Sequence, residues 1–79
     1  MKHSVDYLYS FSKGEFETDR YLFSFYNENN ELKQIEVDMD TKDGKTYMTI
    51  NQYESDTLSE DEKDMLYYLL DRWAINNLI

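Results

Sequence analysis

Apolar and polar residues alternate through four successive segments of the chain, and this period of two restricts the fold more than any other feature of the sequence. Such alternation is typical of a β-strand with one buried face. The segments predict strands at about residues 4–12, 20–27, 32–39 and 45–53. The chain is therefore expected to form a sheet of four strands.

Three turn signals connect these strands and favour an antiparallel order. The first loop is Lys13-Gly14-Glu15 or a longer loop of odd length, and the second is Glu28-Asn29-Asn30. A loop of odd length keeps the odd-numbered apolar residues of its flanking strands on one face. Asp43-Gly44 is a two-residue hairpin signal, because both of its positions must accept positive φ. This even loop moves the buried residues of the last strand to even positions, which are Met48 and Ile50.

A helix is predicted over residues 59–78, after the last strand. Ser59 and Glu62 have the spacing of a capping box, and an apolar stripe follows at helical spacing, formed by Leu66, Leu69, Leu70 and Trp73. At ~1.5 Å per residue this helix is about as long as the strands. It would cover the sheet residues Val5, Tyr7, Tyr9, Tyr21, Phe23, Phe25, Ile35, Val37, Met48 and Ile50.

These elements predict a single α+β domain over residues 1–79 with the order ββββα. A four-stranded antiparallel β-meander is covered on one face by one C-terminal α-helix. No internal repeat, linker or second domain is visible in the sequence.

The composition favours a soluble protein of the cytoplasm. None of the 79 residues is Cys, which suits a reducing compartment. The N-terminal residues lack the apolar core of a signal peptide, and no run approaches the ~18 apolar residues that cross a bilayer. Eight Tyr, four Phe and one Trp are too many for the composition of a disordered chain.

Acidic residues outnumber basic residues by 17 to 8, which gives a formal charge of −9. This charge repels nucleic acid and anionic lipid, since binding to either depends mainly on Lys and Arg. We therefore expect no direct contact with nucleic acid or membrane. The charge attracts a basic protein surface, including a groove that normally holds nucleic acid. Solubility alone is the alternative explanation of the acidity.

The acidic residues fall into three groups, and each is a candidate partner-binding surface. On the third strand the acids alternate at ~6.6 Å, which predicts an exposed row on the face away from the core. A second group alternates before the second strand, and a third surrounds the helix start, where acids also stabilise the helix dipole. The three groups are Glu36, Asp38 and Asp40; Glu15, Glu17 and Asp19; and Glu54, Asp56, Glu60, Asp61, Glu62 and Asp64, of which Glu60, Asp61 and Asp64 are the candidates for partner binding.

Aromatic and apolar residues outside the predicted core are a second candidate surface. Tyr beside carboxylates is typical of protein recognition, because its ring gives rigid contact area and its hydroxyl a polar tip. The candidates are Tyr26, Tyr47 and Tyr53 on the open face of the sheet, and Tyr67, Tyr68 and Leu78 on the helix. The rear of the helix alternatively closes a homodimer.

The sequence gives no indication of catalysis, a cofactor or a metal site. His3 is the only His and no Cys is present, so a Ser or Cys nucleophile has no well-placed base. The two glycines lie in separate turns, which excludes a P-loop. An EF-hand loop from Asp38 would have Lys42 in a ligand position and Thr49 in place of its closing Glu. We expect a non-enzymatic protein without a metal or cofactor.

In general character the chain resembles small phage-encoded inhibitors of host proteins, including anti-CRISPR and DNA-mimic proteins. The features that carry this resemblance are its small size, its acidity and the segments Glu36-Val37-Asp38-Met39-Asp40 and Ser59-Glu60-Asp61-Glu62-Lys63-Asp64. The resemblance implies an inhibitor that occupies the basic surface of a nucleic-acid-binding host or defence protein, without turnover. The alternative is a structural or regulatory module that homodimerises through the rear face of its C-terminal helix.

Overall fold

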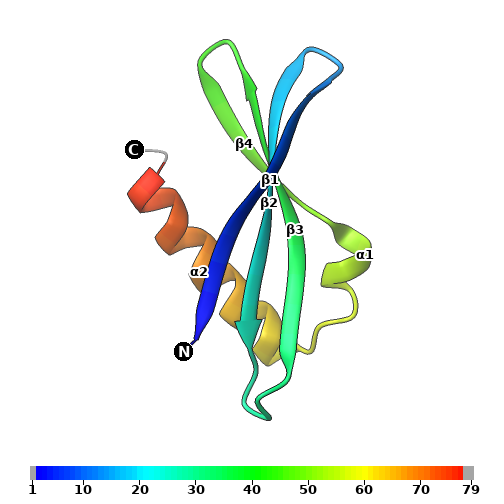
Figure 1. Cartoon of the computed structure of the whole chain (residues 1–79), viewed down its shortest axis with the longest axis vertical. Helices are drawn as coiled ribbons and strands as arrows, with labels where there is room; N and C mark the ends of the chain where they lie inside the picture. Colours follow the sequence, from blue (N-terminus) through cyan, green and yellow to red (C-terminus); the bar gives the residue numbers. More distant parts are fainter. Residues whose placement is uncertain (1, 78–79) are drawn as a thin grey trace.

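A computed structural model describes residues 2–77 and has the predicted order of elements. Strands β1 (His3–Lys13), β2 (Phe16–Tyr26), β3 (Leu32–Lys42) and β4 (Lys45–Ile50) form one antiparallel sheet in the order β1-β2-β3-β4. A short helix α1 (Gln52–Ser55) follows, and helix α2 (Glu60–Asn77) then lies across one face of the sheet (Figure 1). The predicted α+β fold of order ββββα is confirmed.

Residues with positive φ form the turns that set the register of β3. Asp43 and Gly44 have φ of 53° and 78°, as the hairpin signal predicts, and Asn30 has φ of 62°. The loop between β2 and β3 contains residues 27–31, so it is longer than expected but still odd. Phe23 therefore pairs with Ile35 on the face that α2 covers, in agreement with the prediction.

The connection between β1 and β2 differs from the prediction. Lys13 pairs with Phe16, so Gly14-Glu15 forms a two-residue turn and β2 begins at Phe16 rather than at about residue 20. A bulge at Leu8 inserts one residue into β1. The odd-numbered residues before the bulge therefore pair with odd-numbered residues of β2, as predicted.

The bulge divides the apolar residues of β1 between the two faces of the sheet. Val5 pairs with Phe23 on the face that α2 covers, as predicted. Beyond the bulge, Tyr9 pairs with Arg20 and lies on the opposite face. The expectation that Tyr9 belongs to the helix-covered face is therefore wrong, because the pattern of alternation alone does not reveal an inserted residue.

The hydrophobic core lies between the sheet and α2. Its buried apolar residues are Phe23, Phe25, Ile35, Val37, Met39, Leu58, Leu66, Leu69 and Leu70. Trp73 packs on the rings of Tyr21 and Phe23, with centroid distances of 5.0 and 6.1 Å. Tyr7 and Met48 were expected in this core but are exposed. Tyr7 lies on the outermost strand, and Met48 lies in the hairpin that diverges from the helix (Figure 1).

Strand β4 ends at Ile50, earlier than the predicted residue 53, because Asn51 begins a helical turn. The Asn51 side chain accepts a hydrogen bond from the Glu54 backbone N–H at 3.1 Å. The Glu54 carboxylate accepts one from the Glu36 N–H at 3.0 Å, and the Glu36 carbonyl accepts one from Asn51 N–H at 3.0 Å. These two contacts satisfy the backbone of β3 where β4 no longer accompanies it.

The predicted capping box starts α2. The Ser59 hydroxyl accepts from the Glu62 N–H at 3.2 Å, and the Glu62 carboxylate accepts from the Ser59 N–H at 2.8 Å. The helix then presents Leu66, Leu69 and Leu70 to the sheet. Within the described residues, neither helix combines the length and the apolar composition that crossing a membrane requires.

Candidate protein-interaction surface

The acidic residues of β3 are not an exposed row. Asp38 and Asp40 lie on the face opposite α2, as their positions predict, but only 7% and 5% of their surfaces are exposed. The predicted open row of Glu36, Asp38 and Asp40 is therefore wrong for its last two members. Basic and hydroxyl side chains of β1, β2 and β4 cover them.

Arg20 and Lys13 neutralise the two buried carboxylates. Arg20 stands opposite Asp38 across the strands and binds both of its oxygens, with Nε at 2.7 Å and Nη2 at 3.0 Å. Lys13 Nζ lies 3.3 Å from Asp38 and 3.1 Å from Asp40. The guanidinium of Arg20 also lies 4.8 Å from the centre of the Phe11 ring.

Two hydroxyl groups complete the surroundings of Asp40. Thr18 donates to one carboxylate oxygen at 2.7 Å, and Thr49 donates to the other at 2.8 Å. With Lys13 nearby, every oxygen of this carboxylate is satisfied. This network, formed by Lys13, Thr18, Arg20, Asp38, Asp40 and Thr49, is a structural element, because its charges are internally compensated.

The network lowers the pKa values of both aspartates. Hydrogen bonds from Arg20 hold the pKa of Asp38 below its ordinary value of 3.8, and they outweigh burial, which acts in the opposite direction. Burial also raises the pKa of Asp40, but hydrogen bonds from Thr18, Thr49 and Lys13 outweigh it, and the net shift is downward. Both carboxylates are therefore held in their ionised form.

Glu62 is a third buried carboxylate, and it joins the helix start to the loop before β3. Its oxygens accept from the Ser59 N–H and from Asn27 Nδ2, each at 2.8 Å, and Lys33 Nζ lies 3.7 Å away. The hydrogen bonds from Ser59 and Asn27 lower the pKa of Glu62 below its ordinary value of 4.5.

We expect the thermal unfolding midpoint to fall as the pH is lowered below about 4. Asp38, Asp40 and Glu62 have lowered pKa values in the folded protein, so the unfolded chain binds protons more readily. Their stabilisation is fully present above the ordinary pKa values and is lost as the pH falls through the folded-state values. Circular dichroism melts from neutral pH to about pH 2 measure this decline.

The Asp38→Asn variant separates this effect from the general repulsion among surface carboxylates, which acts equally in both proteins. The stability difference between wild type and Asp38→Asn should be greatest near neutral pH and should shrink in acid, where Asp38 is protonated. A difference that does not vary with pH would contradict the role of Asp38. The exposed Asp61→Asn substitution is the matched control and should have a much smaller effect at every pH.

The second predicted acidic group is exposed, and two of its members accept hydrogen bonds from β1. Glu17 accepts from the Ser12 hydroxyl at 3.3 Å, and Asp19 accepts from that of Ser10 at 2.5 Å. Glu15 forms an ion pair with Lys42 across the two hairpin tips. The tips also bring Lys45 close to Lys42, in a shallow depression beside Phe16 and Tyr47. This end of the molecule therefore contains both signs of charge.

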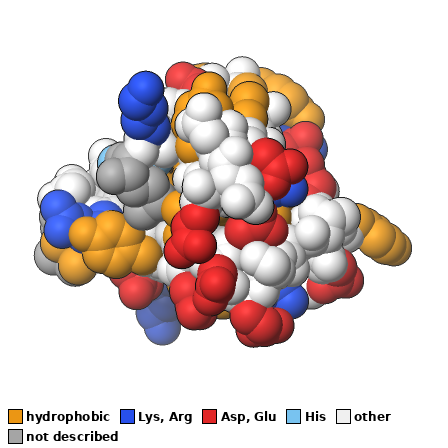
Figure 2. Space-filling model, turned by 90° about the horizontal axis from the view of Figure 1, so that it is seen from below, with side chains coloured by type: hydrophobic (Ala, Val, Ile, Leu, Met, Phe, Trp, Pro, Cys, Tyr) orange, Lys and Arg blue, Asp and Glu red, His pale blue; other side chains and the backbone are white. Residues whose placement is uncertain are grey.

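The third acidic group gains members that the sequence prediction did not include. Glu28 and Glu31, in the loop between β2 and β3, lie beside Asp61 around a groove of about 330 Å³. Glu60 and Asp64 occupy the adjoining turns of α2. We call Glu28, Glu31, Glu60, Asp61 and Asp64 the acidic end. Figure 2 shows this end of the molecule, where Asp and Glu side chains cluster.

Asn27 positions the loop that contributes to the acidic end. Its side-chain oxygen accepts from the backbone N–H groups of Asn29 and Glu31 at 3.0 and 2.9 Å. Its amide nitrogen donates to Glu31 at 3.0 Å and to Glu62 at 2.8 Å. The sequence prediction did not include Asn27. The available signal was an Asn directly before a polar loop, where its side chain commonly replaces a backbone turn.

The candidate tyrosines are exposed but are distributed over β2, β4, α1 and α2. Tyr47 packs edge-on against Phe16 at the hairpin tips, and Tyr68 accepts a hydrogen bond from Arg72 on α2 at 3.3 Å. Tyr53 is 88% exposed, and the prediction that it lies on the open face of the sheet is wrong, because it belongs to α1. Tyr26 ends β2 and Tyr67 lies on α2, both exposed. Leu78 lies outside the described residues.

Over residues 2–77, no three His, Cys, Asp or Glu side chains form a group that could hold a metal ion. The chain matches no protein-family model, no curated protein and no solved structure. The distribution of charge and the exposed surface are therefore the features of this structure that indicate a function.

Proposed function

We propose that this chain is a non-enzymatic, acidic binding protein that acts in the cytoplasm. In this proposal it inhibits a nucleic-acid-binding host or defence protein by occupying that protein's basic surface. The observation that carries the proposal is the acidic end, where Glu28, Asp61 and Asp64 are exposed and form no ion pair with the described residues 2–77.

The distribution of charge supports an interaction through this end. The buried carboxylates Asp38, Asp40 and Glu62 are matched by Lys13, Arg20 and Lys33. The formal charge of −9 is therefore carried by the other side chains. Such a charge speeds encounter with a basic surface and imposes a strong salt dependence on the complex.

The shape of the acidic end supports recognition beyond simple attraction. The Asn27 and Glu62 hydrogen bonds fix the loop of Glu28 and Glu31 against the first turn of α2. The backbone that carries these acidic residues therefore loses little additional freedom on binding, which favours recognition of a fixed set of cations. A preformed acidic surface of this kind suits competition with the phosphates of a nucleic acid.

Affinity capture from lysate, followed by competition with duplex DNA, tests the proposal. We expect the wild-type chain to retain proteins that bind DNA, and we expect DNA and rising salt to release them. Neutralising three charges with Glu28→Gln, Asp61→Asn and Asp64→Asn should reduce capture by about tenfold.

The matched control neutralises three exposed acids at the other end, with Glu15→Gln, Glu17→Gln and Asp19→Asn, and should retain most of the capture. Equal capture by the two triple variants would show that only net charge matters. Capture that DNA does not compete would refute occupation of a nucleic-acid site.

A second candidate is a module that homodimerises through the rear of α2. The exposed ring of Tyr67 on that helix favours it, since 47% of its surface is accessible in the single chain. Sedimentation equilibrium distinguishes the candidates. A dimer that Tyr67→Ser dissociates would support this function, whereas a monomer at high concentration would exclude it.

A further inference from the structure

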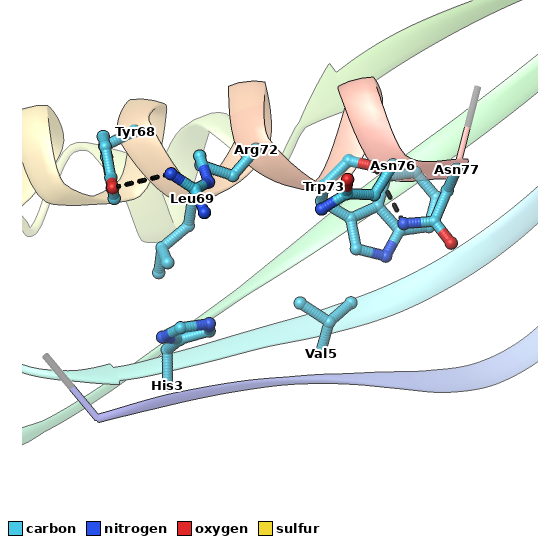
Figure 3. Close-up of a pocket in the computed structure, with 8 residues that line it drawn as sticks. All are labelled: His3, Val5, Tyr68, Leu69, Arg72, Trp73, Asn76 and Asn77. Atoms are coloured by element: carbon cyan, nitrogen blue, oxygen red, sulfur yellow. Dashed lines mark hydrogen bonds between the residues drawn. The ribbon is translucent and has the colours of Figure 1, made fainter. Parts of the chain in front are cut away.

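A cavity of about 210 Å³ lies between β1 and the C-terminal half of α2, whereas the acidic end lies at the start of that helix. In Figure 3, Leu69 and Trp73 point from the helix toward the strand, and Val5 points from the strand toward the helix. His3 also lines the cavity from the strand. Leu69, Trp73 and Val5 therefore form an apolar wall.

The apolar wall of the cavity belongs to the core of the domain. Leu69 is buried, and Val5 packs against the core cluster. The Trp73 ring contacts those of Tyr21 and Phe23, with centroid distances of 5.0 and 6.1 Å. Because these contacts already hold the three side chains of the wall, little of the binding energy of a ligand would be lost in ordering them.

Arg72 supplies a positive charge to the rim of the cavity. Its Nη1 donates to the Tyr68 hydroxyl at 3.3 Å, and its guanidinium carbon lies 5.7 Å from the centre of the Tyr68 ring. Arg72 forms no other hydrogen bond and no ion pair with the described residues 2–77. A guanidinium has five N–H donors, so most of them remain available, and two can bind both oxygens of a carboxylate.

The rim of the cavity differs in charge from the molecule as a whole. None of the described residues that line it is Asp or Glu, although the chain has a formal charge of −9. Asn76 adds a side-chain amide to the rim. The cavity therefore offers donors to an anion and, among these lining residues, no carboxylate that would repel it.

The volume of the cavity limits the size of the ligand. A cavity of about 150 Å³ can hold benzene, so this cavity has room for one ring or one branched aliphatic group. Drug-sized ligands occupy pockets of about 300 Å³ or more. A nucleotide is therefore too large, whereas a single apolar group with an attached carboxylate matches both the wall and the rim.

We propose that this cavity binds a monocarboxylate that carries one ring or one branched aliphatic group. The apolar group contacts Val5, Leu69 and Trp73, and the carboxylate pairs with Arg72. A free organic acid and the C-terminal residue of a peptide share this chemistry, and experiment distinguishes these two sources. The proposal is independent of the acidic end.

An NMR titration of the full chain tests the proposal with benzoate and benzamide, which share a ring but differ in charge. Benzoate is expected to shift the amide signals of Val5 and residues 68–77, with a Kd on the order of 1 mM for a ligand of this size. Benzamide should bind about tenfold more weakly, because it cannot form the ion pair. The charge of −9 disfavours nonspecific attraction of the anion.

Arg72→Gln and Lys63→Gln form a matched pair. Each removes one positive charge from α2, but Lys63 lies near the start of the helix, where its Nζ is 3.8 Å from Glu60. Arg72→Gln should weaken benzoate binding about tenfold and leave benzamide binding unchanged. Lys63→Gln should change neither. Arg72 is exposed, so its substitution should leave the fold intact.

Val5→Phe tests the apolar wall, because the larger ring fills part of the cavity. It should abolish the binding of both benzoate and benzamide, and thermal melts identify any loss of folding. The Arg72→Gln comparison remains decisive if this variant does not fold.

The source of the carboxylate is distinguished with 3-phenylpropanoate and glycylglycylphenylalanine, which carry the same ring and the same acidic group. Tighter binding of the free acid identifies a small metabolite as the ligand, and tighter binding of the tripeptide identifies the end of a polypeptide.

Three results would overturn the proposal. Benzoate might shift no signal of residues 68–77, benzamide could bind as tightly as benzoate, or Arg72→Gln and Lys63→Gln could weaken benzoate binding equally.

Discussion

Replacing Arg20 by Met is expected to lower the free energy of unfolding by about 3 kcal/mol. The substitution retains much of the aliphatic length but leaves Asp38 without its bidentate partner, at a position where only 10% of the aspartate side chain is exposed. Lys13 remains within reach of Asp38, and 26% of the Arg20 side chain is accessible to water. Both facts favour the lower end of the range for a broken buried pair. Urea unfolding followed by circular dichroism measures the change.

The double variant Arg20→Met/Asp38→Leu is the control for this prediction. Removing both charges eliminates the unpaired carboxylate, so most of the lost stability should return. A double variant less stable than Arg20→Met would show that Asp38 contributes mainly through its other contacts. A single variant within about 0.5 kcal/mol of wild type would contradict the burial of the pair.

Leu66→Ala is expected to cost about 3 kcal/mol, because it opens a cavity where the helix contacts the sheet. Leu66 is fully buried within the core cluster. A domain of this size buries only ~60% of the surface that its unfolded chain exposes and is marginally stable, so such a loss removes a large share of its total stability. The unfolding midpoint should fall by about 15 °C.

Tyr67→Ala is the matched control for Leu66→Ala, one position along the same helix. The Tyr67 ring is exposed, and the substitution should change the free energy of unfolding by less than about 0.5 kcal/mol. Similar losses at both positions would mean that Tyr67 packs as closely as Leu66, because Ala has the highest helix propensity and neither loss could arise from propensity. If Leu66→Ala lowered the free energy of unfolding only slightly, the helix would have to contact the sheet through other residues.

The fold was predictable because its local signals agree with one another. Asp43-Gly44 and Asn30 accept positive φ where the chain reverses, and Ser59 with Glu62 begins the helix as a capping box. The apolar alternation of β2 and β3 then places Phe23 and Ile35 on one face. Each signal acts within a few residues, so the order of elements could be derived without tertiary information.

The bulge at Leu8 shows where this reasoning fails. A strand with one inserted residue keeps its alternating sequence, but the side chains beyond the insertion exchange faces. Tyr9 was therefore assigned to the core, whereas it packs beside Arg20 on the opposite face. The bulge follows only when two requirements are combined: a two-residue turn at Gly14-Glu15, and a Val5 that packs on the helix-covered face.

The candidate surface was less predictable than the fold, because burial of a charge depends on its neighbours across the strands. Asp38 and Asp40 alternate as exposed residues do, but Arg20 and Thr18 stand opposite them in the sheet. The predicted loop Glu28-Asn29-Asn30 already sets this register, but an alternating row of acids does not indicate which side chains cover it from the neighbouring strands. The acidic residues at the start of α2 were identified, whereas Glu28 and Glu31 join them only through the hydrogen bonds of Asn27.

The core contacts only part of the length of the sheet. The two parts of the molecule therefore differ in how readily they open locally. Core residues on β2 and β3 extend from Phe25 to Met39, while the turns at Gly14 and Gly44 lie in the tips that diverge beyond them (Figure 1). Amide hydrogens near the two glycines can therefore exchange with solvent through local opening, whereas those of Phe23 and Val37 require global unfolding. The hairpin tips can therefore rearrange locally without unfolding the part of the domain that α2 covers.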